Sequence, residues 1–121
     1  MIVLDASAVL AYLRGEPGGT TVQQALSDGA CCSAANWSEI MQKSLWEKRD
    51  WNAARQLLEG YELVVEPVTR ADAEAAARLW DTHRTWSLGD RLCLALAQRL
   101  GVRLLTADAA WGTDDPIQQI R

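Results

Sequence analysis

Short apolar segments of strand length alternate with longer helical patterns along the chain. Strands are expected at 2–4, 30–33, 62–67, 102–105 and 117–120, and helices at 6–13, 20–27, 34–49, 51–59, 70–82 and 87–100. The loop 14–19, rich in glycine and proline, separates the first two helices clearly. Strands that alternate with helices predict an α/β fold, in which helices cover both faces of a parallel sheet.

The length and composition indicate one globular domain spanning residues 1–121. The chain is 49% hydrophobic and 23% charged, which is typical of a folded domain. No apolar run approaches the roughly 20 residues of a membrane-spanning helix, and no basic region precedes the N-terminal apolar residues as in a signal peptide. The three cysteines lack the C-x-x-C spacing of a zinc site and are odd in number, which argues against a disulfide framework. We expect a soluble, cytoplasmic protein with buried thiols.

The charge balance excludes a general nucleic-acid-binding protein with a basic face. The formal net charge is -4, from 16 acidic and 12 basic residues. Arginine makes up nearly all of the basic residues, and its guanidinium suits paired contacts with phosphate or carboxylate groups. The composition therefore does not exclude a local arginine patch on an acidic protein.

Acidic residues stand where the predicted strands end and the following helices begin. Asp5 follows the strand 2–4, and Asp108 follows the strand 102–105 within Thr106-Ala107-Asp108. Asp90 lies in the first turn of the helix 87–100, and Glu39 lies early in the helix 34–49. Because sites in parallel α/β folds lie beyond the carboxyl ends of the strands, these acids are expected to converge.

Each acid also has a purely structural interpretation. Asp5 is a suitable N-cap for the helix 6–13, and Ser87 with Asp90 has the spacing of a capping box. Glu39 lies off the apolar stripe of its helix and is four residues from Lys43, a spacing that suits a surface ion pair. Asp108 fits a first-turn acid that follows Thr106 as N-cap.

Taken together, the four acids favour a metal site. Carboxylates that share a cleft repel one another, by roughly 1–4 kcal/mol per pair at about 4 Å, and therefore need a cation. Oxygen ligands suit Mg²⁺ or Mn²⁺, whereas zinc prefers histidine and cysteine. The single histidine, His83, excludes a pair of histidines as general acid and base. The pattern indicates metal-assisted phosphoryl transfer.

The same residues resemble the PIN-domain family, and more closely its VapC-type toxins from bacterial toxin–antitoxin pairs. The resemblance covers almost the whole chain. It is carried by Asp5-Ala-Ser7-Ala, the mid-chain Glu39, the run 88–97 (Leu-Gly-Asp-Arg-Leu-Cys-Leu-Ala-Leu-Ala) and the segment 105–111 (Leu-Thr-Ala-Asp-Ala-Ala-Trp). It implies a three-layer α/β/α sandwich with a parallel sheet of about four to five strands. It also implies an endoribonuclease that depends on Mg²⁺ or Mn²⁺.

The resemblance further implies roles for individual residues and partners. Asp5 and Asp90 match the principal metal-binding acids, while Glu39 and Asp108 match two further acids of the catalytic set. Ser7 and Thr106 match supporting hydroxyl positions. Expected partners are a VapB-type antitoxin, an RNA substrate such as a transfer RNA or ribosomal RNA, and a second copy of the chain in a homodimer.

Two other functions are compatible with the same residues. The chain fits a PIN nuclease of RNA maturation outside any toxin pair. It also fits a non-catalytic module whose acidic cleft binds a basic peptide.

The six tryptophans are numerous for this length. Trp37 and Trp111 are expected in the core, whereas Trp46, Trp51 and Trp86 are expected to be more exposed, close in sequence to arginines. Such exposed aromatics suit a protein interface or stacking with RNA bases.

Overall fold

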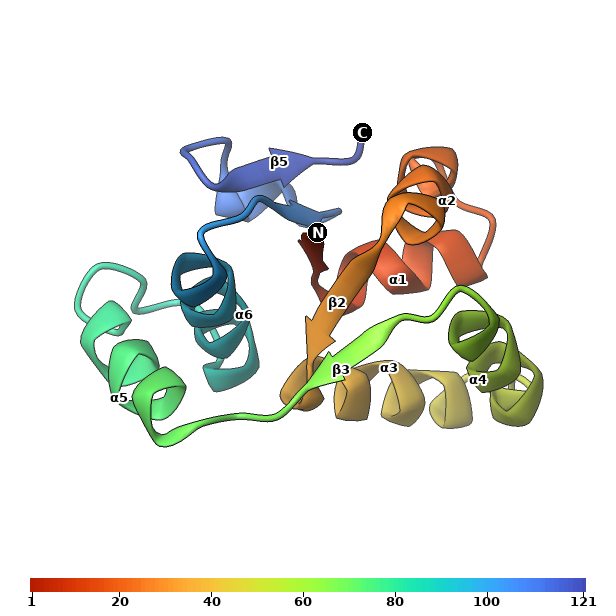
Figure 1. The fold of residues 1–121 in the computed structure, drawn as a ribbon, viewed down its shortest axis with the longest axis horizontal. Coiled ribbons are helices and arrows are strands. Elements are labelled where there is room, and N and C mark those ends of the chain that lie inside the picture. Colours follow the sequence, from red (N-terminus) through yellow and green to blue (C-terminus); the bar gives the residue numbers. More distant parts are fainter.

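The sheet has five parallel strands in the order β3-β2-β1-β4-β5 (Figure 1). This computed structural model describes residues 1–121. The strands are β1 (Ile2–Leu4), β2 (Ala30–Ser33), β3 (Val64–Glu66), β4 (Leu104–Thr106) and β5 (Ile117–Gln119). The helices are α1 (Ala6–Leu13), α2 (Gly19–Asp28), α3 (Ala34–Trp46), α4 (Trp51–Gly60), α5 (Arg70–Leu79) and α6 (Leu88–Leu100), with a short 3-10 helix η1 (Ala109–Trp111).

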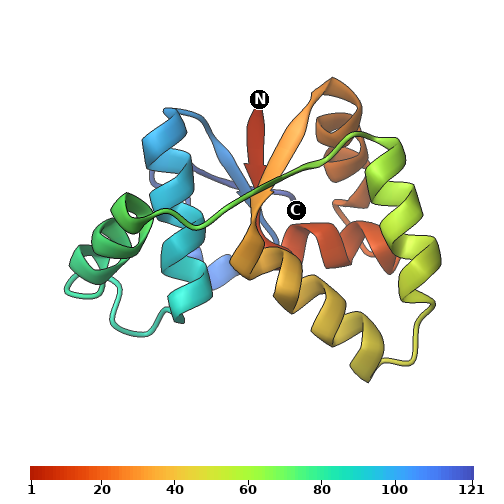
Figure 2. The ribbon, with the colours of Figure 1, turned by 60° about the horizontal axis from the view of Figure 1, so that its bottom comes forward.

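Successive strand residues point into two separate cores, one on each face of the sheet. Leu4 and Leu105 pack with α1, α2, α3 and α4, whereas Val3 and Leu104 pack with α6. Figure 2 shows these two groups of helices on opposite sides of the strands, with α5 lying outside α6. The alternation follows from the period of two along a strand. It confirms the expected three-layer α/β/α sandwich.

Most helix ends agree with the local signals in the sequence. Asp50 caps α4 by accepting a hydrogen bond from the backbone N–H of Ala53, and Gly101 ends α6 in a left-handed conformation with φ of 67°. The helix expected over 34–49 is wrong at its C-terminal end, because it stops at Trp46. Lys48 has a φ of 57°, in the left-handed region, which a continuing helix does not allow.

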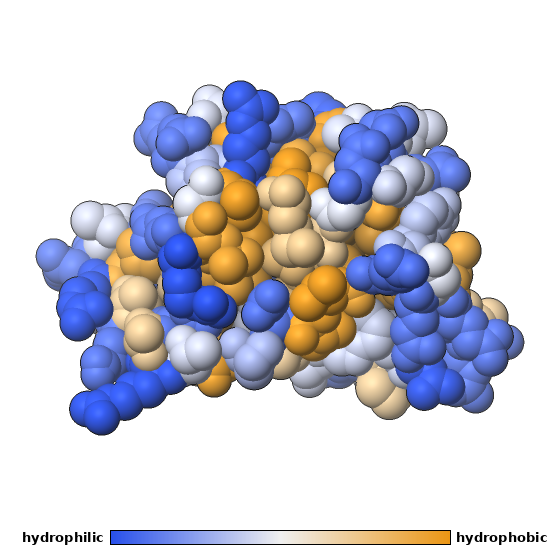
Figure 3. Space-filling model, viewed as in Figure 1, coloured by the Kyte–Doolittle hydropathy of each residue, from blue (hydrophilic) through white to orange (hydrophobic).

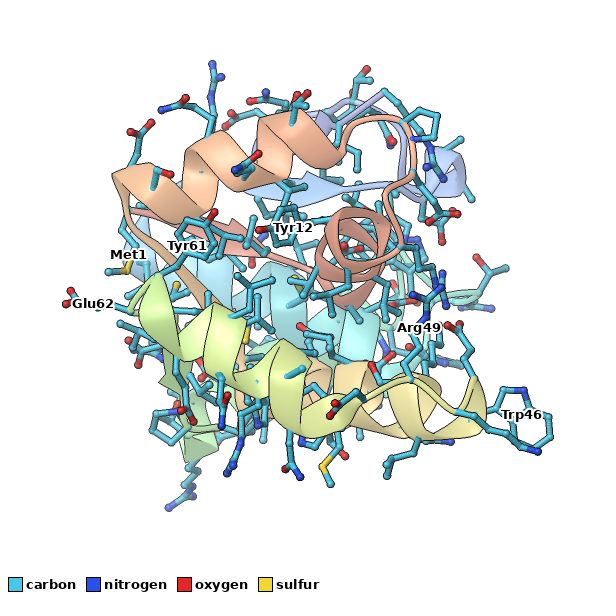
Figure 4. All side chains as sticks on the ribbon, turned by 90° about the vertical axis from the view of Figure 1, so that its right-hand side faces the viewer. Met1, Tyr12, Trp46, Arg49, Tyr61 and Glu62 are labelled. Carbon is cyan, nitrogen blue, oxygen red and sulfur yellow. The ribbon has the colours of Figure 1, made fainter.

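The tryptophan predictions were partly wrong. Trp51 is buried, not exposed, because its ring packs edge-to-face on Trp37 with centroids 5.1 Å apart. Trp86 is half-buried and stacks on the buried Trp111 at 4.3 Å. Trp46 is 84% exposed, as expected, and Figure 4 shows it projecting from the end of α3.

Helix α6 buries more than one side within the chain itself. Residues 92–97 are all buried, since they lie between the sheet and α5. The three cysteines are buried free thiols, as expected. None of the helices combines the length and the apolar character that a bilayer crossing demands.

Candidate active site

The pairing of β1 with β4 places Asp5 beside Thr106. Leu4 lies opposite Leu105 in the register of these parallel strands, and the Asp5 N–H donates to the carbonyl of Leu105 at 3.1 Å. Asp5 is therefore the first residue beyond β1 at the carboxyl end of the sheet. This is the edge at which parallel α/β folds place their sites.

Hydroxyl and amide donors surround the Asp5 carboxylate. Thr106 Oγ1 donates to Oδ2 at 2.5 Å, Ser7 Oγ lies within 2.9 Å of both carboxylate oxygens, and the N–H of Ala8 donates to Oδ1 at 2.8 Å. Ser7 Oγ in turn accepts from the N–H of Ala107 at 2.9 Å. The structure thus brings Ser7 and Thr106 onto Asp5 and fixes the orientation of its side chain.

No cationic side chain forms an ion pair with Asp5. The residue is only 3% exposed, and burial raises its pKa from 3.8 to about 6, against the hydrogen bonds from Thr106, Ala8 and Ser7. The nearby charge of Asp90 raises the pKa further. A buried carboxylate held only by neutral donors is poised to accept a positive charge.

Asp90 approaches the same region from the first turn of α6. Ser87 and Asp90 form the predicted capping box: the Asp90 N–H donates to Ser87 Oγ at 3.1 Å, and the Ser87 N–H donates to the Asp90 carboxylate at 3.3 Å. Burial raises the pKa of Asp90 above its ordinary value, although Ser87 acts to lower it. The charge of Asp108 raises this pKa as well, and that of Lys43 lowers it.

Glu39 and Asp108 complete the acidic group. Glu39 is half-buried on α3 and accepts a hydrogen bond from Asn36 Nδ2 at 3.0 Å. No ion pair within 4.0 Å joins it to Lys43, so the predicted surface pair does not form. Asp108 is exposed and caps η1 by accepting from the N–H of Ala110.

All four acids line one cavity of about 240 Å³. Its other lining residues are Ala6, Ser7, Lys43, Ser87 and Trp111. Lys43 is thus the only cationic side chain on its wall. Asp5 and Asp90 have the predicted capping roles with the same carboxylates that line the cavity. The structural interpretation of Asp108 is wrong, because Thr106 ends β4 and Asp108 itself is the N-cap of η1.

The chemistry of the side chains fits a hard divalent cation. The cavity offers carboxylate and hydroxyl oxygens and no histidine or cysteine, as Mg²⁺ and Mn²⁺ prefer. No three of the acids stand close enough to form a ready metal cage. The buried, uncompensated charge of Asp5 is the observation that supports the fit.

The sequence did not indicate the roles of two residues of this region: Asn36 was not singled out, and Lys43 was expected in a surface ion pair with Glu39. Asn36 is buried beneath Glu39, and Lys43 faces the cavity and not a surface partner. The spacing of three residues between Asn36 and Glu39 on one helix was the available signal, because such residues share a face. Nothing local in the sequence distinguished a Lys43 side chain that faces the cavity from one that pairs with Glu39 at the surface.

Comparisons with known proteins show the family of this chain. The model of the PIN domain family matches residues 2–112. Ribonuclease VapC42 of Mycobacterium tuberculosis and a VapC ribonuclease of Mycobacterium bovis are each 31% identical over 117 residues, covering 86% of this chain and 88% of theirs.

Among solved structures, a toxin–antitoxin complex from Klebsiella pneumoniae has a TM-score of 0.84 at 16% identity, covering 100% of this chain and 98% of that chain. The Mycobacterium tuberculosis VapC20, a sarcin-ricin loop cleaving toxin, has a TM-score of 0.69 at 18% identity, covering 93% and 95%. These structures share the fold. The chain belongs to the PIN-domain family, among the VapC ribonucleases.

Proposed function

We propose that this protein is a metal-dependent endoribonuclease and the toxin of a toxin–antitoxin pair. The observation that carries the proposal is the cavity lined by Asp5, Glu39, Asp90 and Asp108 at the carboxyl end of the sheet. The identity to VapC ribonucleases supports RNA as the substrate. The buried free thiols are compatible with action in the cytoplasm, where thiols stay reduced.

In this proposal Asp5 and Asp90 are the principal ligands of Mg²⁺ or Mn²⁺, and Glu39 and Asp108 complete the set. The chemistry supplied by a bound ion is activation of the attacking water and stabilisation of negative charge on the phosphodiester. Ser7 and Thr106 keep the Asp5 carboxylate oriented through their hydrogen bonds. Lys43, at the wall of the cavity, suits contact with a phosphate of the substrate.

We infer a structured RNA, a transfer RNA or a ribosomal RNA, as the substrate class. The fold neighbour VapC20 supports this inference, because it is a toxin that cleaves the sarcin-ricin loop. The negative net charge of this chain also favours recognition at a defined loop over general binding along an RNA backbone.

A VapB-type antitoxin is the expected protein partner. The Klebsiella complex and the VapBC structures from Rickettsia felis and Salmonella typhimurium are neighbours in fold. Beside the acidic cavity lies a second, more apolar cavity of about 650 Å³ along α3, which includes Met41, Leu45 and Trp46 and shares Lys43 with the first. An antitoxin segment with apolar residues and an arginine would cover α3 and neutralise the acids.

A homodimer is part of the proposal. Val64 and Val65 of the edge strand β3 are 40% and 37% exposed. Figure 3 shows apolar surface gathered on the face of the molecule that β3 crosses in Figure 1. Such a surface suits a second copy of the chain. Light scattering on the antitoxin-free protein measures the mass, which should be twice 13.3 kDa.

The experiment that tests the proposal is RNA cleavage by the purified protein, with Mn²⁺ or Mg²⁺ and with EDTA. We expect discrete cuts in total cellular RNA that EDTA abolishes. Asp90→Asn removes a charged ligand of the proposed metal site. It should reduce cleavage by no less than the roughly 10–100-fold that changes around such ligands cause, while its hydrogen bonds as a helix cap remain available.

Asp114→Asn provides the matched control, because Asp114 is exposed and does not line the cavity. It should cleave like the wild type. Equal cleavage by Asp90→Asn and the wild type would exclude the proposed mechanism. Binding of a basic peptide without any cleavage would favour the non-catalytic alternative.

A further inference from the structure

The side chain of Asn36 links Glu39 to the first turn of α6. Asn36 is 1% exposed. Its Nδ2 donates to Glu39 Oε1 at 3.0 Å and to the carbonyl oxygen of Gly89 at 3.3 Å. Gly89 immediately precedes Asp90, so one amide joins the elements that carry two of the four acids.

Only one orientation of the Asn36 amide satisfies these contacts. Rotating the amide by 180° would place Oδ1 against two acceptors, the Glu39 carboxylate and the Gly89 carbonyl. In the observed orientation Oδ1 is buried without a hydrogen-bond partner. The two donor contacts of Nδ2, and not Oδ1, account for an asparagine at this position.

Gly89 provides the space that the Glu39 carboxylate occupies. A Cβ atom built on Gly89 would overlap Glu39 Oε1 and would stand 3.2 Å from Glu39 Cδ. Gly89 does not have a positive φ, so backbone conformation does not require glycine there. The overlapping atom is the end of a flexible side chain. An alanine at this position would therefore displace the carboxylate and leave the fold intact.

We propose that Asn36 and Gly89 are positioning residues for Glu39. The Asn36 amide holds the Glu39 carboxylate, and the absent side chain of Gly89 allows that carboxylate to lie against the first turn of α6, beside Asp90. The two residues thereby set the distance between acids that come from α3 and α6. This inference rests on the proposed function, in which Glu39 belongs to the metal site.

The test is the Mn²⁺ affinity of the full chain, measured by titration calorimetry or electron paramagnetic resonance, together with the melting temperature. Asn36→Ala and Gly89→Ala should each weaken Mn²⁺ binding by about 10–100-fold, as loss of a residue that orients a ligand does. Gly89→Ala should melt no lower than the wild type, because alanine is the better helix former. If Mn²⁺ binding weakens and the melting temperature does not fall, the residue positions a ligand and does not merely stabilise the fold.

Two control variants match these changes. Ser44→Ala removes another buried polar group of α3, whose hydroxyl bonds only to the carbonyl of Ile40. Gly60→Ala adds a methyl group at a helical glycine with no atom within 4 Å of the new Cβ. Both should bind Mn²⁺ like the wild type.

A double-mutant cycle with Glu39→Gln tests the route of the effect. If Asn36 and Gly89 act through the Glu39 carboxylate, neither substitution weakens Mn²⁺ binding by more than about 2-fold in the Glu39→Gln background. An undiminished effect in that background would overturn the inference.

Failure of the inference is distinguishable from failure of the proposed function. The inference alone fails if Glu39→Gln weakens Mn²⁺ binding and neither Gly89→Ala nor Asn36→Ala does. If Asn36→Ala does not fold, Gly89→Ala decides the matter. Both the proposed function and the inference fail if the wild type binds no Mn²⁺ and EDTA has no effect on RNA cleavage.

Discussion

Replacement of Asp5 by asparagine should stabilise the metal-free protein at neutral pH. Burial raises the pKa of Asp5 from 3.8 to about 6, so ionisation costs more in the folded state than in the unfolded state. One pKa unit corresponds to about 1.4 kcal/mol, which makes the cost about 3 kcal/mol at pH 7. Asparagine keeps the capping acceptor for the Ala8 N–H and carries no charge.

The sign of the pH dependence follows from linkage. Between pH 3.8 and about 6 the folded state binds more protons at Asp5 than the unfolded state does, so stability falls as pH rises through this window. The extra cost of ionising Asp5 in the folded state is absent below pH 3.8. It reaches about half of its full value at pH 5 and nearly its full value at pH 7. The gain from Asp5→Asn should therefore grow with pH in the same way.

Urea denaturation in EDTA at pH 5, 6, 7 and 8 measures this effect. Asp114→Asn, which removes an exposed acid, is the control and should change the free energy of unfolding by less than about 0.5 kcal/mol. Saturating Mn²⁺ should stabilise the wild type at pH 7 and should stabilise Asp5→Asn much less, because the cation offsets the buried charge. The reasoning is refuted if Asp5→Asn is no more stable than the wild type at pH 7, or if its gain does not increase with pH.

Two further predictions concern residues outside the acidic cavity. Asp72→Ala should lower the free energy of unfolding by about 2 kcal/mol in chemical denaturation, because the buried Asp72 accepts two hydrogen bonds from Arg99 that join α5 to α6. Burial acts to raise the pKa of Asp72, but the bonds from Arg99 and the Thr69 backbone outweigh it and lower the pKa. This contribution is therefore present at neutral pH and disappears as pH falls through the folded-state pKa. Trp46→Ala should leave stability within about 0.5 kcal/mol of the wild type and weaken antitoxin binding by roughly 30-fold in a calorimetric titration; unchanged antitoxin affinity would exclude α3 as the docking surface.

The parts of the fold with local signals could be predicted from the sequence. Strand β1 and helix α1 have the expected bounds, and the capping box of Ser87 and Asp90 starts α6 as its spacing indicates. The arrival of the acids at one cavity also follows from a general rule, because the strands are parallel and their carboxyl ends share an edge.

The parts that depend on distant contacts could not be predicted in this way. The contact of Asn36 with Gly89 joins residues separated by 53 positions and exists only once α3 and α6 pack together. The burial of Trp51 depends on the position of Trp37 across a helix pair. An exposed and a buried tryptophan have the same local pattern, so only the packing decides between them.

The central claim is that the four acids bind a divalent cation at the carboxyl end of the sheet. Anomalous diffraction from crystals of the wild type grown with Mn²⁺ tests it most directly. The account predicts a manganese peak in the cavity lined by Asp5, Glu39, Asp90 and Asp108, and its loss in Asp90→Asn. Absence of that peak at a Mn²⁺ concentration that supports RNA cleavage would contradict the account.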